Sequence, residues 1–232
     1  MKTPLHFDPS SWPLRRATFG APCLANTSLT ILKPQLKKAL RPLAARLAAK
    51  GVTANQVTLA SLAGSAAVGL LLCTNSSHPA LFALLPLWLP IRMACAAIDG
   101  MLAIEFGQKS RLGGVLNEAG DILSDAALFM PLAFIVPFTV SSIAFLIVLA
   151  MLAEVAGMAG PALGSDRRVE GPLGKADRSI ILAVLGLLIA ILGELPQGAL
   201  LLMPLLYAGL VLTIWNRLRL ALADPRKGVD AE

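Results

Sequence analysis

The stretch AIDGMLAIEFGQKSRLGGVLNEAGDILSDA, from Ala97 to Ala126, places charge in the middle of an otherwise apolar chain. Its candidate functional residues are the polar side chains Asp99, Asn117, Glu118, Asp121 and Asp125. Carboxylates inside or beside a bilayer are costly, and those that occur there often serve a function. The stretch therefore predicts two helices of a bundle, with a functional site near the loop that joins them.

The composition indicates that this bundle lies in a membrane. Hydrophobic residues make up 56% of the 232-residue chain and charged residues 15%, whereas soluble domains carry about a quarter charged residues. Several apolar runs are long enough to cross a hydrocarbon core of roughly 30 Å. We therefore predict an all-α, polytopic membrane protein. The three cysteines are scattered, which argues against a disulfide framework or a zinc site.

Apolar segments predict six transmembrane helices. These cover approximately residues 55–73, 79–103, 113–137, 141–163, 179–192 and 198–220. Ahead of them, leucines at helical spacing and basic residues on another face predict an amphipathic interfacial helix, with a basic linker as the alternative. The predicted parts are a cytoplasmic N-terminal arm (1–28), an amphipathic juxtamembrane helix (29–52), a six-helix transmembrane domain (53–221) and a cytoplasmic C-terminal tail (222–232).

The basic residues predict the orientation in the membrane. Loops at 74–78, 138–141 and 193–197 contain no Lys or Arg, whereas those on the opposite side are basic. The positive-inside rule places the basic side, both termini and the acidic stretch on the cytoplasmic side of an inner membrane. The net charge of +6 then reflects topology and contact with anionic membrane lipids. No nucleic-acid partner is expected, because the chain has no reading motif.

The polar residues of the acidic stretch fall on one helix face. Asn117, Asp121 and Asp125 recur every four residues, which stacks them along that face. The short connection predicts that Asp99 faces Asn117 and Asp121 from an antiparallel neighbour. Oxygen ligands converging in this way suit a hard divalent cation. Small residues beside them either only pack the helices or let a phosphate approach the backbone, and the residues alone leave both interpretations open.

The spacing of this segment resembles the signature of the CDP-alcohol phosphotransferase (CDP-alcohol phosphatidyltransferase) family, D-x-x-D-G-x-x-A-R-x8-G-x3-D-x3-D. In this chain the signature positions hold Ala96, Asp99, Gly100, Ala103, Ile104, Gly113, Asn117 and Asp121, with every spacing kept. The segment AAKGVTANQVTL before the first span also resembles the family, so the resemblance covers roughly residues 36–219. Ala96, Ile104 and Asn117 depart from the signature and replace two carboxylates and an arginine.

The resemblance implies a function in phospholipid biosynthesis. Members of the family transfer a substituted phosphate from a CDP-linked donor, commonly CDP-diacylglycerol, to a small alcohol and release CMP, with metal ions offsetting the developing charge. By position it implies Mg²⁺ or Mn²⁺ bound by Asp99, Asn117 and Asp121, with Asp125 as a compensating ligand, and Asp121 as the base. It implies a CDP-lipid site at Gly100, Ala103, Ser110 and Gly113, phosphate contacts from Arg111, Lys175 and Arg178, and a homodimer.

Other interpretations remain open on the sequence. A relative that binds a nucleotide-lipid or a partner without turnover is the main alternative, and a small transporter is less favoured because the chain shows no internal repeat. Arg92 and Glu154 lie within predicted spans, and a mutual ion pair would reduce the cost of burying them. Ala156, Gly157 and Gly160 form a small-residue face, suited to contacts within one protomer or between two.

Overall fold

The computed structural model describes residues 29–163 and 166–223, and within these ranges the chain folds entirely into helices and connections. Seven α-helices follow one another: α1 (Leu29–Ala49), α2 (Ala54–Thr74), α3 (Leu84–Ile104), α4 (Arg111–Phe129), α5 (Val140–Ala162), α6 (Lys175–Leu192) and α7 (Leu202–Ala223). Short 3₁₀ helices precede α3 (η2, Pro79–Ala83), follow α4 (η3, Met130–Phe134) and precede α7 (η4, Gln197–Leu201). The all-α prediction is confirmed. The arm at 1–28 and most of the C-terminal tail lie outside the described residues.

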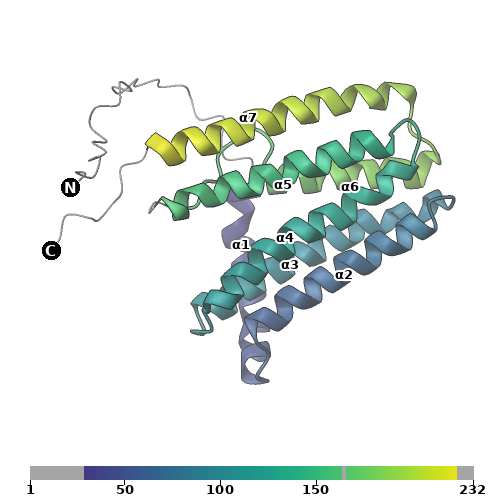
Figure 1. The fold of residues 1–232 in the computed structure, drawn as a ribbon. Coiled ribbons are helices and arrows are strands. Elements are labelled where there is room, and N and C mark those ends of the chain that lie inside the picture. The colour runs from purple at the N-terminus through teal and green to yellow at the C-terminus, as the bar shows by residue number, and fades with distance from the viewer. Residues whose placement is uncertain (1–28, 164–165, 224–232) are drawn as a thin grey trace, which may run out of the picture.

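The helices pack into a bundle with one helix across its end. In Figure 1, α5 and α7 run side by side along one side of the bundle, and α2, α3 and α4 form the other. Helix α2 packs against both α3 and α4, α4 also contacts α5, and α6 packs against α3. Helix α1 runs across the ends of the bundle helices and contacts α3. The helix is continuous through Pro34 and Pro42, and its place in the membrane interface stays a prediction.

Local sequence explains where the helices begin and end. Thr53 caps α2: its hydroxyl accepts a hydrogen bond from the Gln56 amide, and the Gln56 side chain accepts one from the Thr53 amide. Such reciprocal capping satisfies two amides that the first helical turn leaves unpaired. The predicted third span to residue 137 is too long, because α4 ends at Phe129 and η3 follows. Pro131 at the start of η3 cannot donate an α-helical hydrogen bond, which accounts for this change.

Four of the predicted spans are long and apolar enough to cross a membrane, among the residues described. These are Ala54–Thr74, Pro79–Ile104, Val140–Ala162 and Gln197–Ala223. Helices α4 and α6 are shorter, at 19 and 18 residues, and carry four and three charged residues. The structure therefore supports an integral membrane protein with seven helices, four of which are candidate spans. The other two predicted spans correspond to α4 and α6, and these helices carry many of the charged groups described below.

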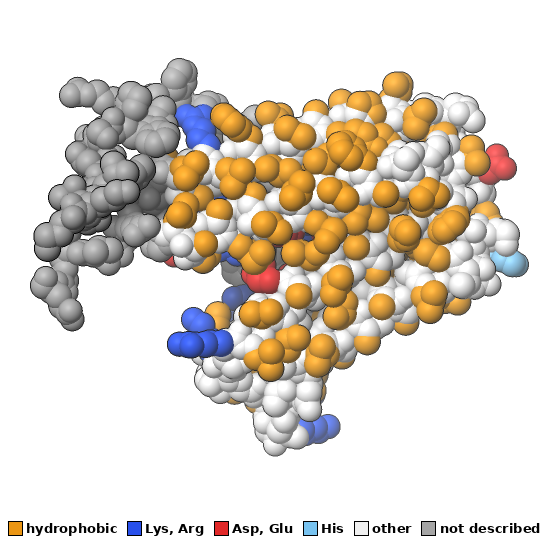
Figure 2. Space-filling model, viewed as in Figure 1, with side chains coloured by type: hydrophobic (Ala, Val, Ile, Leu, Met, Phe, Trp, Pro, Cys, Tyr) orange, Lys and Arg blue, Asp and Glu red, His pale blue; other side chains and the backbone are white. Residues whose placement is uncertain are grey.

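The surface of the bundle separates apolar from charged side chains. Figure 2 shows hydrophobic side chains over the length of the bundle, while most charged side chains on this face lie toward the end near α1. Large aliphatic side chains on the outside are strongly exposed, including Ile191 at 70% and Leu205 at 69%. Exposed apolar area on this scale is typical of a surface that contacts lipid.

The small-residue face of α5 packs within the protomer. A Cβ on Gly157 would lie 2.7 Å from the Arg168 carbonyl oxygen, and one on Gly160 would lie 2.2 Å from that of Asp166. Residues of the loop between α5 and α6 therefore rest directly on these glycines. Of the two roles expected for this face, the structure selects contacts inside one copy of the chain.

Candidate active site

A cavity of about 330 Å³ opens between α2, the end of α3 and the start of α4. Drug-sized and cofactor ligands occupy pockets of roughly 300–1,000 Å³. Sequence analysis predicts Asp99, Gly100, Ala103, Ser110, Gly113 and Asn117 as site residues, and all of them line this cavity. The signature positions Ala96 and Ile104 also line it. Side chains and backbone of the signature segment thus surround one common space.

The glycines that line the cavity have two different structural roles. A Cβ on Gly100 or Gly114 would meet no atom within 4 Å, so both face the open cavity. A Cβ on Gly113 would lie 2.7 Å from Asn55 Oδ1 and 2.9 Å from Ser110 Oγ. Gly113 therefore allows α2 to approach the first turn of α4, whereas Gly100 and Gly114 leave backbone exposed to a ligand.

Helix α2 contributes residues that the sequence analysis missed. Asn55 and Thr58 line the cavity, and Thr58 Oγ1 donates a hydrogen bond of 2.9 Å to Asp99 Oδ2. The short loop between them predicts that α3 and α4 pack directly against each other. In the structure α3 and α4 make few contacts with each other and α2 packs against both, so the wall of the site includes α2.

The loop between α3 and α4 is fastened to the start of α2. Gln108 Oε1 accepts a hydrogen bond of 2.7 Å from the Ala54 amide, and Gln108 Nε2 donates one of 3.3 Å to the Val52 carbonyl. Lys109, the next residue, lines the cavity. Gln108 lies in the part of the signature where any residue is allowed, so the pattern could not single it out.

The first turn of α4 adds polar character to the same cavity. Ser110 is the N-cap residue, and its Oγ accepts a hydrogen bond of 2.9 Å from the Gly113 amide. Amides at a helix N-terminus carry partial positive charge and commonly bind phosphate groups. Arg111, a predicted phosphate contact, is the first residue of α4 and is exposed. The cavity thus combines an acidic wall at Asp99 with a positive edge at the start of α4.

The carboxylates further along α4 are engaged in ion pairs. Asp125 Oδ1 lies 2.6 Å from Arg92 Nη1, and its Oδ2 lies 2.7 Å from Arg178 Nη2. Asp121 pairs through Oδ1 with Lys175 Nζ and, at 3.6 Å, with Arg92 Nη2. The one-face stacking of Asp121 and Asp125 is therefore present, but their partners are basic side chains of α3 and α6.

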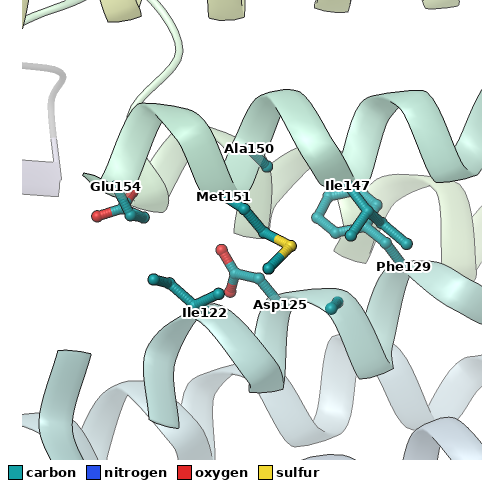
Figure 3. Close-up of a pocket in the computed structure, with 8 residues that line it drawn as sticks. Ile122, Asp125, Phe129, Ile147, Ala150, Met151 and Glu154 are labelled. Carbon is teal, nitrogen blue, oxygen red and sulfur yellow. The ribbon is translucent and has the colours of Figure 1, made fainter. Parts of the chain in front are cut away.

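Glu154 on α5 is the centre of a second group of ion pairs. Its carboxylate lies 2.8 Å from Arg178, 2.9 Å from Arg167 and 3.6 Å from Arg217. The expected direct pair between Arg92 and Glu154 is absent from the described contacts, and the two are linked through Asp125 and Arg178. Figure 3 shows Asp125 and Glu154 on neighbouring helices around a void of about 10 Å³, room for about one water molecule at most.

The predicted phosphate contacts on α6 lie in its first turn, where the sequence analysis expected a loop. Arg178 is buried at 2% exposure, and its charge is shared between Asp125 and Glu154. Lys175 is partly exposed and pairs with Asp121. Buried guanidinium groups are retained when carboxylates compensate them. The position of Arg178 is therefore that of a side chain that joins α4, α5 and α6.

The inner membrane protein YnbA of Escherichia coli (strain K12) is 41% identical over 188 residues, which cover 81% of this chain and 93% of YnbA. The chain belongs to the YnbA family. No protein-family model matches the chain. Membership of the YnbA family agrees with the apolar helices in assigning the chain to a membrane.

Two solved structures share the fold of this YnbA relative. Phosphatidylinositol phosphate synthase (PgsA1) of Mycobacterium tuberculosis with CDP-DAG bound superposes with a TM-score of 0.65 at 24% identity, covering 82% of this chain and 96% of PgsA1. The same enzyme in complex with manganese and citrate gives 0.65 at 23% identity, covering 82% and 92%. At this identity the likeness establishes the fold. The chain shares the fold of this phosphatidylinositol phosphate synthase.

The residues of this YnbA relative do not match the divalent metal that the resemblance implies. Among residues 29–163 and 166–223, no group of three or more His, Cys, Asp or Glu side chains is placed to hold a metal ion. Of the expected ligands, Asp99 and Asn117 line the cavity, whereas Asp121 and Asp125 are paired with basic side chains. Asp125 in particular has an arginine on each oxygen. The predicted Mg²⁺ or Mn²⁺ site therefore does not fit the donors as arranged.

Proposed function

We propose that this protein transfers a phosphatidyl group from a CDP-linked lipid, CDP-diacylglycerol in the first instance, to a small alcohol, with release of CMP. One observation carries the proposal: the signature positions from Ala96 to Asn117 line a single cavity of ligand size, and Asp121 follows one turn further along α4. A signature retained for packing alone would not require an open space at its centre. The shared fold with an enzyme solved with CDP-DAG bound supports the same conclusion.

The cavity offers complementary contacts for the donor. Its diphosphate would lie at the start of α4, where Ser110, Gly113 and Gly114 expose a helix N-terminus and Lys109 adds positive charge. Gly100 and Ala103 leave room for the nucleotide against α3. Positioning of the phosphates supplies much of the rate enhancement in phosphoryl transfer. No step of the proposal depends on a metal ion.

Asp121 is the proposed base. The acceptor hydroxyl oxygen forms a bond to the lipid-linked phosphorus while the bond from that phosphorus to the CMP oxygen breaks. The hydroxyl proton passes to Asp121, and CMP leaves with the bonding electron pair. Asp121 lies one turn beyond Asn117, which lines the cavity, and its side chain is 20% exposed. A base must reach the hydroxyl directly or through one water molecule, and this partial exposure allows that approach.

The proposal places the site on the cytoplasmic side of the inner membrane. Helix α1, most charged side chains and the cavity all lie at the same end of the bundle. The positive-inside rule assigns that end to the cytoplasm. Assembly as a homodimer is also part of the proposal, with an interface away from Gly157 and Gly160, whose surface the chain itself covers.

A second function has one observation in its favour. The ion pairs of Asp121 and Asp125 leave fewer free carboxylates than a metal-dependent transferase would use. A family relative that binds a nucleotide-lipid without turnover would tolerate this arrangement. The two functions share the donor cavity and differ only in whether a labelled lipid product appears.

The deciding experiment uses the full-length protein in vesicles with phosphorus-labelled CDP-diacylglycerol and a panel of alcohols, with and without Mg²⁺ or Mn²⁺. The transferase proposal predicts CMP release together with a new labelled lipid, both lost in Asp121→Asn. Retention of the donor without product would favour the binding protein. Absence of both product and donor binding would contradict the two functions alike.

A further inference from the structure

The charged groups around Asp121 already neutralise one another. Within the described part of the chain, ion pairs connect five basic side chains with four carboxylates: Arg92, Arg167, Lys175, Arg178 and Arg217 with Glu118, Asp121, Asp125 and Glu154. We call this set the charge network. Five positive against four negative charges leave +1, and the nearby carboxylate of Asp99 offsets it. No basic side chain of the network is left to balance an additional anion.

An acceptor molecule that reaches Asp121 from water would first meet the partly exposed members of the network. These are Asp121, Glu118, Lys175 and Arg167, with side-chain exposures of 20%, 23%, 32% and 32%. Arg178, Arg217 and Glu154 lie deeper, at 5% or less. Figure 2 shows both acidic and basic side chains in the hollow between the two sides of the bundle. The accessible rim therefore contains as many carboxylates as cations.

Glu118 and Glu154 hold Arg167, the partly exposed arginine of the network. Arg167 Nη1 lies 2.6 Å from Glu118 Oε1, and Arg167 Nη2 lies 2.9 Å from Glu154 Oε2. Both terminal nitrogens of the guanidinium are thus occupied by carboxylates of the chain. The fork geometry that would bind a phosphate in a bidentate manner is used internally.

Some arginine nitrogens of the charge network nevertheless have no hydrogen-bond partner. Arg167 Nε and Arg178 Nη1 are buried and have no hydrogen-bond partner in the structure. A hydroxyl group can accept from such donors without adding charge. A phosphate monoester would add about two negative charges beside Glu118 and Asp121, and like charges brought together in a binding site are strongly unfavourable.

We propose that the acceptor is an uncharged, hydroxyl-bearing alcohol, and that Glu118 and Glu154 exclude phosphorylated alcohols by holding the arginines of the charge network. This inference rests on the proposed transferase function and specifies its second substrate. It makes Glu118 and Glu154 specificity-determining residues, which contact neither the donor nor the reacting phosphorus.

The first test needs no variant. Wild-type protein in vesicles receives labelled CDP-diacylglycerol and equal concentrations of an alcohol and its phosphate ester: glycerol with glycerol 3-phosphate, then inositol with inositol phosphate. We expect an about tenfold or larger preference for the uncharged partner of each pair, because discrimination here rests on repulsion of a buried charge. Equal use of both partners, or preference for the phosphorylated one, would overturn the inference.

The second test uses binding, so that it remains decisive if no alcohol is converted. Inorganic phosphate and glycerol 3-phosphate are added to detergent-purified protein, and thermal stabilisation is measured, since a ligand of the native state raises the melting temperature. Wild type should show no more stabilisation at millimolar phosphate than the start of α4 provides, whereas Glu118→Gln and Glu154→Gln should show a further increase. Glu118→Gln is the milder change, because Arg167 keeps Glu154.

The matched control is Glu105→Gln, which removes an exposed carboxylate paired with Arg41 outside the network. It should behave as wild type. Equal phosphate stabilisation of Glu118→Gln and Glu105→Gln would overturn the inference even when the protein is folded. Absence of turnover in wild type together with a phosphate gain in Glu118→Gln would instead reject the proposed transfer and keep the exclusion of phosphate.

Discussion

Arg178 Nη2 on α6 lies 2.7 Å from Asp125 Oδ2 on α4, and both side chains are buried. The same guanidinium lies 2.8 Å from Glu154 on α5. One arginine therefore connects three helices close to the candidate site. The position of Asp121, one turn before Asp125, depends on this connection.

Replacement of Arg178 by methionine should destabilise the protein. Removing one partner of a buried ion pair leaves an uncompensated charge and costs about 3–5 kcal/mol. Thermal unfolding in detergent, followed by fluorescence-detected size exclusion, measures the effect. Arg41→Met is the matched control: Arg41 is exposed and pairs with exposed Glu105 at 3.0 Å, and such surface pairs contribute about 0–1 kcal/mol. Equal losses in both variants would show that the network does not stabilise the fold.

Gly113→Ala and Gly114→Ala should have opposite effects on stability. A Cβ at position 113 would meet Asn55 and Ser110 at less than 3 Å, whereas one at 114 would meet nothing within 4 Å. We expect Gly113→Ala to cost about 1–3 kcal/mol through overpacking and disturbance of the Ser110 cap. Gly114→Ala should gain up to about 1 kcal/mol from helix propensity. Paired thermal melts provide the measurement, and identical shifts would contradict the close approach of α2 to α4.

Wild-type protein should show no saturable Mn²⁺ binding in the micromolar range, because Lys175 occupies Asp121 and arginines occupy Asp125. Asn117→Asp combined with Lys175→Met should gain such binding, since the pair adds one carboxylate to the cavity wall and frees another. Electron paramagnetic resonance of free Mn²⁺ measures it. Asn117→Asp with Lys50→Met, an exposed lysine of the α1–α2 connection, is the control. Tight Mn²⁺ binding by wild type would mean that Lys175 leaves Asp121.

Thr58→Val should lower the affinity for donor more than it lowers stability. The change keeps the side-chain shape but removes the hydrogen bond to Asp99 Oδ2, so Asp99 loses its fixed orientation beside the cavity. A net hydrogen bond to a charged group is worth about 1.5–3 kcal/mol. Equilibrium binding of CDP-diacylglycerol and thermal melts should be measured together. Unchanged donor binding would mean that the orientation of Asp99 does not contribute to the affinity for CDP-diacylglycerol.

Much of the fold could be predicted because helical periodicity and apolar length are local properties. The helix order follows from the succession of apolar segments. The cavity residues Asp99, Gly100, Gly113 and Asn117 could be predicted because they lie in one continuous segment with a recognisable spacing. The end of α4 was misplaced because an apolar run continues past Phe129 although the backbone changes to η3. Apolar composition alone does not report the effect of Pro131.

The charge network could not be predicted because its partners come from distant parts of the chain. Arg92 and Glu154 were recognised as buried charges, yet Arg178 was assigned to a loop and its two carboxylate partners to other roles. Pairing of buried charges depends on which helices are neighbours, and in the structure α6 packs against α3 and α4 packs against α5. Thr58 and Asn55 were missed for the same reason.

The central claim, that the cavity lined by the signature residues binds a CDP-linked lipid, is tested most directly by donor binding to a variant in which that cavity is filled. Gly100→Leu projects a side chain into open space, and Gly198→Leu does the same at η4, outside the residues that line the cavity. Labelled CDP-diacylglycerol should bind wild type and Gly198→Leu in lipid nanodiscs and should fail to bind folded Gly100→Leu. Equal binding by all three proteins would contradict the assignment of the cavity.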